Sequence, residues 1–152
     1  MSFRAKSTYP NSMSYLVDTN VWSELTKGYP QPEVIRWLTE HESLLHISTI
    51  SLGELRYGIV TLPESQRKEE LQGWLKQLTK TTAGRTLSFN RSVAYTWADL
   101  RASASRKGYR LPLADSMIAA IAKKHQLKVV TRNVRDFQNA GVSTVNPFAL
   151  SK

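Results

Sequence analysis

The stretch Tyr15-Leu16-Val17-Asp18-Thr19-Asn20-Val21 decides the fold, because an apolar run ends at an acid and a helical pattern begins behind it. Three apolar residues bounded in this way predict a short buried strand. An acid follows or closes an apolar segment three more times, at Glu54, Asp115 and Asp136. If the apolar segments are neighbouring strands of one parallel sheet, their carboxyl ends face one crevice, where such sheets bind ligands. The sequence therefore predicts that four carboxylates meet at one edge of a sheet.

Strand and helix patterns alternate along the rest of the chain. Strands are predicted over 15–17, 44–50, 86–89, 128–131 and 142–145. Helices are predicted over 19–25, 32–42, 51–62, 64–78, 92–107 and 112–125, and a short turn or helix carries Asp136. This alternation predicts a three-layer α/β/α domain with a mainly parallel central sheet of four to five strands.

The length and composition fit one globular domain. The chain has 152 residues, of which 41% are hydrophobic, and this is enough for a buried core. Residues 1–13 are expected to be a polar N-terminal extension, with Met13 as an alternative start, and the domain is expected over 14–150. The lack of cysteine excludes disulfides and thiolate metal sites and suits the cytoplasm. No stretch is apolar for long enough to predict a membrane span.

The charge balance is strongly basic, with 21 Lys and Arg against 12 Asp and Glu and a net charge of +9. Such a balance favours nucleic acid or another acidic partner, although a solvated basic surface explains it as well. The glutamates other than Glu54, Glu24 among them, lie mostly beside basic or polar residues in helix patterns. These glutamates are predicted to be solvated.

Each of the four acids also has a structural explanation. Asp18 can cap the helix that follows it. Ser51 and Glu54 have the spacing of a capping box, and Asp115 lies in a first helical turn, where the helix dipole favours a negative charge. Four carboxylates at one edge would nevertheless repel one another unless a divalent cation neutralised them. Oxygen ligands of this kind suit Mg²⁺ and Mn²⁺.

The motifs around these acids resemble those of the PIN-domain ribonucleases, specifically the VapC-type toxins of bacterial toxin–antitoxin pairs. The likeness covers about residues 14–148 in the family's order, and it rests on residues 16–21, 48–58, 113–120, 130–137 and 145–148. It implies that Mg²⁺ or Mn²⁺ is bound by Asp18, Glu54, Asp115 and Asp136. It also implies that the site is supported by the polar residues Asn20, Thr131 and Asn133.

The resemblance implies an endoribonuclease that hydrolyses RNA by a metal-activated water and inhibits translation, with tRNA as a typical target. Basic residues near the acids are the candidates for RNA contacts, namely Arg106, Lys107, Arg110, Arg132 and Arg135. Two protein partners are also implied, a second copy in a homodimer and a cognate antitoxin. The apolar stripes at 34–38 and on the helix over 52–62 are candidate interfaces, and core packing explains them equally well.

Two other functions fit the same residues. A PIN-like module that grips RNA or protein without cutting would be expected to lose one or more of the four acids, and this chain keeps all four. A metal-dependent DNA nuclease would use the same phosphate chemistry, since contacts to the 2′-hydroxyl are what separate RNA from DNA. A histidine-based ribonuclease and a Ser-His-Asp hydrolase are disfavoured, because the three histidines have no obvious partner and no G-x-S-x-G motif occurs.

Overall fold

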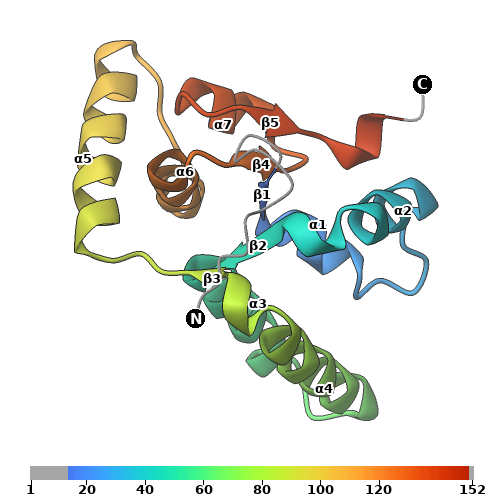
Figure 1. The fold of residues 1–152 in the computed structure, drawn as a ribbon. Helices are drawn as coiled ribbons and strands as arrows, with labels where there is room; N and C mark the ends of the chain where they lie inside the picture. The colour runs from blue at the N-terminus through green and yellow to red at the C-terminus, as the bar shows by residue number, and fades with distance from the viewer. Residues whose placement is uncertain (1–13, 151–152) are drawn as a thin grey trace.

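The computed structural model describes residues 14–150 and has a five-stranded sheet at its centre (Figure 1). The strands are β1 (Tyr15–Val17), β2 (Leu45–Ser48), β3 (Thr86–Leu87), β4 (Lys128–Val130) and β5 (Thr144–Val145). They lie in the order β3-β2-β1-β4-β5, and every neighbouring pair is parallel. The predicted parallel sheet is therefore confirmed. The predicted extension over 1–13, with the alternative start at Met13, lies outside the described residues.

Helices cover both faces of the sheet. Between residues 14 and 150 they are α1 (Thr19–Glu24), α2 (Pro32–Glu40), α3 (Thr49–Val60), α4 (Gln66–Thr81), α5 (Arg91–Arg106), α6 (Leu113–His125) and α7 (Val134–Asn139). Short 3₁₀ turns occur at η2 (Glu42–Leu44), η3 (Ala83–Arg85) and η4 (Pro147–Ala149). Figure 1 shows α5 and α6 on one side of the sheet and α1 and α2 on the other, which confirms the three-layer arrangement. No helix in this part of the chain is long and apolar enough to cross a membrane.

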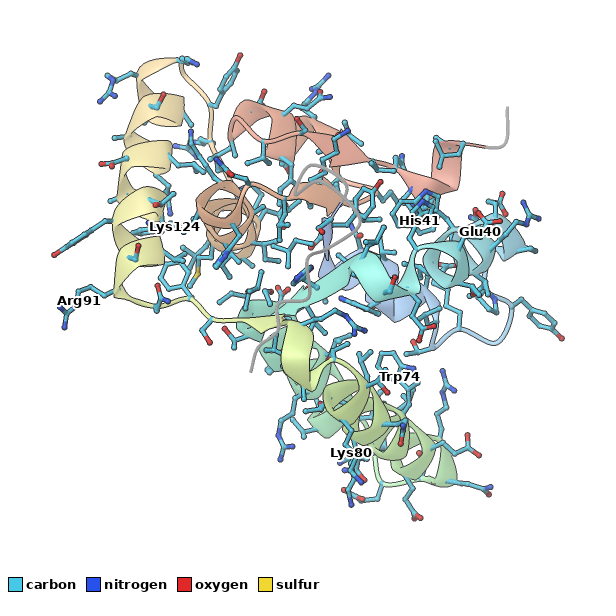
Figure 2. The ribbon with its side chains drawn as sticks, in the orientation of Figure 1. Glu40, His41, Trp74, Lys80, Arg91 and Lys124 are labelled. Carbon is cyan, nitrogen blue, oxygen red and sulfur yellow. The ribbon has the colours of Figure 1, made fainter. Side chains whose placement is uncertain are left out.

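Successive strand residues point to opposite faces of the sheet and build two cores. Leu16 of β1 packs with Phe137 and residues of α5 and α6. Val17 points the other way and packs with Val34 of α2. Trp74 of α4 packs against this second core (Figure 2). Because both faces are covered, β1 and the buried part of β4 (Val129 and Val130) are apolar, which is the pattern that marked them in the sequence.

Helix α3 begins two residues before its predicted start at Ser51. The N-cap is Ser48, whose Oγ accepts a hydrogen bond from the Ser51 N–H at 2.9 Å. The predicted capping box between Ser51 and Glu54 is therefore wrong, because Ser51 already lies inside the helix. Because Ile50 is β-branched, the sequence pattern extended the predicted strand to residue 50. In the structure Ile50 lies in the first turn of α3 and packs against the core.

Glu24 of α1 is buried, so its prediction as a solvated residue is wrong. Its Oε2 accepts a hydrogen bond from the Gln31 N–H at 2.9 Å, and its Oε1 forms an ion pair with Lys27 Nζ at 2.8 Å. Both partners lie beyond the end of α1, in the segment that leads to α2. The buried carboxylate therefore holds this connection closed, and the two partners offset the cost of its burial.

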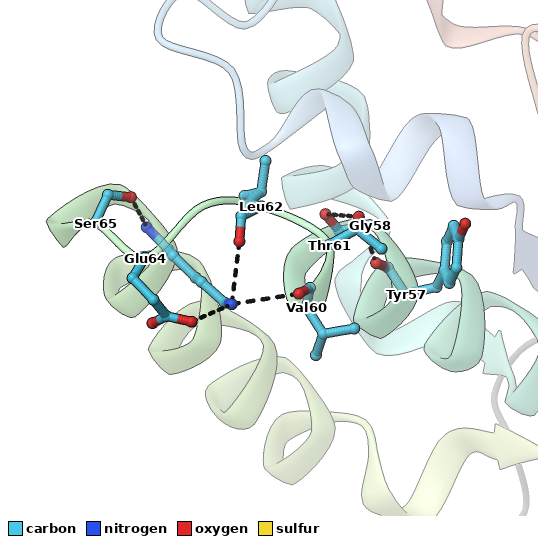
Figure 3. Close-up of polar contacts among 8 residues, drawn as sticks. Tyr57, Gly58, Val60, Thr61, Leu62, Glu64 and Ser65 are labelled. Carbon is cyan, nitrogen blue, oxygen red and sulfur yellow. Dashed lines mark hydrogen bonds and ion pairs between the residues drawn. The ribbon is translucent and has the colours of Figure 1, made fainter.

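The corner between α3 and α4 is fixed by the buried Lys68 (Figure 3). Its Nζ donates hydrogen bonds to the carbonyl oxygens of Val60 at 3.3 Å and Leu62 at 3.1 Å, and to Glu64 Oε2 at 2.7 Å. An ammonium group has three donors, so this buried charge is fully hydrogen-bonded. The same contacts satisfy carbonyls at the end of α3. Helix α4 is thereby held against α3, the helix that carries Glu54.

Candidate active site

The four predicted acids lie on four different elements near the carboxyl edge of the sheet. Asp18 follows β1 directly and caps α1. Asp115 and Asp136 lie in the first turns of α6 and α7, and Glu54 lies in the second turn of α3. The chain runs from β1 to β2 on one side and returns through β4 on the other, so β1 and β4 flank a topological switch point. Open α/β sheets bind ligands at such points. We call these four residues the acidic site.

Strands β1 and β4 bring Asp18 against Thr131, although 113 residues separate them. Val17 is in register with Val130, so the residues that follow them meet beyond the strand ends. Thr131 Oγ1 donates a hydrogen bond to Asp18 Oδ2 at 2.8 Å, and both side chains are buried. The predicted supporting residue Thr131 therefore fixes one oxygen of the first carboxylate.

Asn133 joins two further acids. Its Nδ2 donates hydrogen bonds to Asp115 Oδ2 at 2.5 Å and to Asp136 Oδ2 at 2.8 Å. Its backbone N–H donates to Thr131 Oγ1 at 2.8 Å. One amide group thus bridges two carboxylates on different helices, and it is itself anchored to the hydroxyl that holds Asp18.

Thr19 connects the remaining acid, and neither the charge pattern nor the motifs had singled it out. Its backbone N–H donates to Asp18 Oδ1 at 2.7 Å, and its Oγ1 donates to Glu54 Oε1 at 2.6 Å. The same hydroxyl lies 2.8 Å from Ser51 Oγ. The only signal in the sequence was the position of a hydroxyl residue directly behind the first acid. Together with Thr131 and Asn133, Thr19 links all four acids in one hydrogen-bond network.

Burial and repulsion from neighbouring acids disfavour the ionised form of Asp18 and raise its pKa. Burial is the main cause that raises the pKa of Asp18 from 3.8 to about 6. Repulsion from Asp115 and Glu54 adds to this rise, while the hydrogen bonds from Thr131 and Thr19 oppose it. Asp18 therefore lies within electrostatic reach of Asp115 and Glu54, and a cation among these acids would stabilise its ionised form.

The pKa of Asp115 is raised for the same reasons, first by burial and then by repulsion from Asp136 and Glu54. The hydrogen bond from Asn133 works in the opposite direction. Asp18 and Asp115 are thus both repelled by neighbouring acids of the site.

The residues fit a hard divalent cation by donor chemistry, since carboxylate oxygens are the ligands that Mg²⁺ and Mn²⁺ prefer. Within residues 14–150, however, no three acidic or histidine side chains are grouped tightly enough to hold an ion in their present positions. Hydroxyl and amide hydrogens, mainly those of Thr19, Thr131 and Asn133, satisfy the carboxylates instead.

This arrangement agrees with the comparison to known families, in which the PIN domain matches residues 15–142. The chain belongs to the PIN domain family. Curated relatives of this PIN domain include the VapC ribonuclease Y4jK of Sinorhizobium fredii, which is 36% identical over 88% of this chain and 96% of its own length. The toxin FitB of Neisseria gonorrhoeae is 38% identical over 88% of this chain and 97% of its own length. The resemblance to VapC-type toxins is therefore confirmed.

Solved structures show the same fold. FitAB bound to an IR36 DNA fragment contains a chain that matches this PIN domain with a TM-score of 0.83 and 35% identity, over 91% of this chain and 98% of that one. DNA-bound VapBC from Salmonella typhimurium matches with a TM-score of 0.77 and 26% identity, over 88% of this chain and 98% of that one.

The remaining predicted site residues are Asn20, which forms a hydrogen bond near the acidic site, and five basic residues, which differ in their contacts. Asn20 Oδ1 accepts a hydrogen bond from the Arg132 N–H at 3.4 Å, which ties α1 to the turn behind β4. The Arg132 guanidinium lies 3.8 Å from the centroid of the Phe148 ring, so this side chain packs on η4. Arg132 is nevertheless exposed, as are the other predicted bases, which are Arg106, Lys107, Arg110 and Arg135. None of the ion pairs seen within residues 14–150 joins a base to the acidic site.

Proposed function

We propose that this PIN domain is a Mg²⁺- or Mn²⁺-dependent endoribonuclease and the toxin of a toxin–antitoxin pair. The observation that carries the proposal is the hydrogen-bond network that gathers Asp18, Glu54, Asp115 and Asp136 around one crevice. Relatives with ribonuclease names support the choice of reaction, among them the VapC ribonuclease Y4jK. The net charge of +9 suits a polyanionic substrate.

Bound at the acidic site, the ion would supply Lewis-acid polarisation of a phosphoryl oxygen and a water of lowered pKa. Asp18 and Asp115 are our candidates for direct ligands, because both are destabilised as free anions. Glu54 or Asp136 would orient the attacking water and accept its proton. Attack on the scissile phosphodiester would break its bond to the 3′-oxygen, leaving a 5′-phosphate and a 3′-hydroxyl.

Three residues would position the acids without contacting the RNA themselves, namely Thr19, Thr131 and Asn133. Their hydrogen bonds orient carboxylate oxygens that would otherwise rotate, as partners of metal ligands do in other sites. With an ion present, the Asn133 amide would still hold Asp115 and Asp136 on the same side of the crevice.

The choice of RNA rests on relatives alone. A tRNA(fMet)-specific endonuclease VapC of Salmonella typhimurium is 28% identical over 83% of this chain and 91% of its own length. We therefore propose tRNA as the substrate class and inhibition of translation as its consequence. The cytoplasm, where tRNA is found, stays the predicted location.

The reaction is tested by incubating the protein with matched RNA and DNA strands in Mg²⁺, Mn²⁺ or EDTA. The proposal expects RNA cleavage that EDTA abolishes, with 5′-phosphate ends on the products. Asp115→Asn should remove cleavage, and Asp99→Asn, on the exposed side of α5, should not. RNA binding without cleavage in any metal would favour the non-catalytic module, and equal cleavage of DNA would favour a general nuclease.

An antitoxin is the first proposed protein partner, because the similar solved structures include FitAB and VapBC complexes. A cleft of about 210 Å³ lies beside Glu54 between α1, α3 and α4, and Trp74 forms part of its wall. A hydrophobic segment could fill this cleft while an arginine paired with the carboxylates. Co-expression with the neighbouring gene product should give a stable complex that does not cleave RNA.

A second copy of the chain is the other proposed partner. Tyr57 of α3, Tyr95 of α5 and Leu113 of α6 are exposed apolar side chains that a second copy would cover. The predicted stripe at 34–38 is less suited to this, because Val34 and Leu38 are buried in the domain's own core. Light scattering should give twice the 17.2 kDa mass of one chain, and Tyr57→Asp should reduce it.

A further inference from the structure

A cleft without acidic residues lies between the second half of α5 and the segment that leads into α6. Its volume is about 440 Å³, and it is lined by Arg101, Ser105, Tyr109, Arg110 and Leu111. Clefts of about 300–1,000 Å³ commonly hold small organic groups, so one nucleotide fits the space. Two guanidinium groups and a phenol ring offer contacts to phosphate and to a base. We call this the α5 cleft.

Arg101, on the α5 side of the cleft, is held in place by a contact with the Trp97 ring. The Arg101 guanidinium lies 5.3 Å from the centroid of the Trp97 ring. Trp97 Nε1 donates to Ser116 Oγ at 2.9 Å, and this hydroxyl donates to the Leu113 carbonyl at 2.6 Å. Ser116 is the residue after Asp115. Arg101 and the first turn of α6, which carries Asp115, are therefore positioned by one set of contacts.

The second wall depends on the turn that ends α5. Gly108 has a φ of +84°, which a residue without Cβ adopts at no steric cost. The Tyr109 N–H then donates to the Ala104 carbonyl at 2.9 Å, which closes the end of the helix. Tyr109 leaves this turn with 42% of its surface exposed, and Arg110 follows it into solvent. The tyrosine ring is thus available for stacking.

The α5 cleft is close enough to the acidic site to bind the same strand. Asp115 is five positions after Arg110, so their Cα atoms are at most ~18 Å apart. Stacked nucleotides advance by about 3.4 Å each along one strand. A strand that is cut at the acidic site therefore reaches the α5 cleft after about five nucleotides. A strand that curves around the surface needs a few more.

We infer that the α5 cleft is an RNA subsite, which binds a single nucleotide about five positions along the strand from the scissile bond. Arg101 and Arg110 contact the flanking phosphates, and Tyr109 stacks on the base. The inference rests on the proposed ribonuclease function, which it extends from the cutting site to the binding of the strand. The cleft takes RNA in preference to an acidic protein because an aromatic ring and two arginines line the same space and can serve base and phosphate together.

Binding is measured first, by fluorescence anisotropy of a labelled single-stranded RNA in EDTA, so that cleavage does not interfere. Each phosphate contact contributes about 0.7 to the slope of log K against log salt for single strands, so Arg101→Gln with Arg110→Gln should reduce the slope by about 1.4. Arg91→Gln is the matched control, because Arg91 lies at the other end of α5 and points away from the sheet (Figure 2). It should leave the slope unchanged.

Stacking is tested at Tyr109. Loss of one stacked base should weaken RNA binding by about five- to 150-fold in Tyr109→Ala, while Tyr109→Phe keeps the ring and should bind as the wild type does. Arg110→Gln alone, at an exposed position, keeps the test informative if the double variant does not fold. With Mg²⁺, Tyr109→Ala, Arg110→Gln and the double arginine variant should raise KM and leave kcat unchanged, because they do not touch the acidic site. Tyr109→Phe should leave both constants unchanged.

The outcomes separate this inference from the proposed function. Wild-type protein that binds RNA through these residues without cutting it would overturn the nuclease and leave the subsite standing. Cleavage and binding by the double variant that match those of Arg91→Gln would overturn the subsite alone. A double variant that loses an acidic protein partner while still binding RNA normally would likewise refute the assignment.

Discussion

Asp18→Asn should stabilise the metal-free protein while it abolishes cleavage. The Asp18 carboxyl is 3% exposed, and it is surrounded by other acids rather than by a positive charge. In the absence of an ion, its ionisation therefore works against folding. The change to an amide removes this charge and nearly preserves the shape of the side chain.

The size of the effect follows from the pKa and the hydrogen bonds. A rise from 3.8 to about 6, at about 1.4 kcal/mol for each tenfold change in the ionisation constant, amounts to about 3 kcal/mol at neutral pH. The new amide still accepts from the Thr19 N–H, but the hydrogen bond from Thr131 to Oδ2 is lost, at a cost of about 1 kcal/mol. The net gain is about 2 kcal/mol, or roughly 4–8 °C in Tm for a chain of this length.

The gain depends on pH in a defined direction. Below pH 3.8 the Asp18 carboxyl is protonated in both the folded and the unfolded chain, so ionisation costs nothing. Between pH 3.8 and about 6 the unfolded chain releases its proton while the folded chain keeps it, so wild-type stability falls as pH rises. Above about pH 6 the full penalty is present. The advantage of Asp18→Asn should therefore be largest at pH 7–8 and should disappear near pH 4.

The assay is urea unfolding of both proteins in EDTA from pH 4 to pH 8, with Asp99→Asn as the control for removal of a charge from an exposed position. Mg²⁺ should reverse the order, because a ligand at 100 times its Kd stabilises by about 2.7 kcal/mol and only the wild type should bind it well. The reasoning is refuted if the variant is no more stable than the wild type at pH 7.5 in EDTA, or if the difference does not change with pH.

Three further predictions concern the residues around the acidic site. Asn133→Ala should lower the affinity for Mg²⁺ and the cleavage rate about 10- to 100-fold, since it releases two carboxylates; a metal titration of activity and of Tm measures this, and an unchanged Mg²⁺ dependence would contradict it. Thr19→Val should weaken Mg²⁺ binding while Thr19→Ser restores it, because only the hydroxyl reaches Glu54; equal behaviour of the two variants would remove Thr19 from the site. Lys68→Met should lower the free energy of unfolding by about 1–3 kcal/mol by leaving carbonyls without donors, as shown by urea unfolding beside Lys76→Met on the exposed face of α4.

The fold was predictable from the sequence because its strands are buried on both faces. The apolar runs Tyr15-Leu16-Val17 and Val129-Val130 marked β1 and β4, and the acids behind them marked the carboxyl edge. Asp18 and Thr131 then meet as a consequence of parallel pairing, which requires no knowledge of side-chain packing. The start of α3 was missed because a cap at Ser48 and a cap at Ser51 look alike in sequence.

The site was predictable only in its composition. The motifs named the four acids and Asn133, but nothing in them indicated that one amide would bridge two carboxylates. Such bridges depend on the relative orientation of α6 and α7, which tertiary packing decides. The burial of Lys68 was hidden for a similar reason, since its partners are backbone carbonyls that carry no sequence signal.

The central place of β1 in the sheet has a consequence for the synthesis of the protein. β1 is made first, yet its neighbour β4 and the residues Thr131, Asn133 and Asp136 are made near the end of a chain of 152 residues. A chain still growing on the ribosome therefore lacks these three residues of the hydrogen-bond network until β4 and α7 have been made. We therefore expect a nascent chain that stops before β4 and α7 to have no cleavage activity, because its acidic site is incomplete.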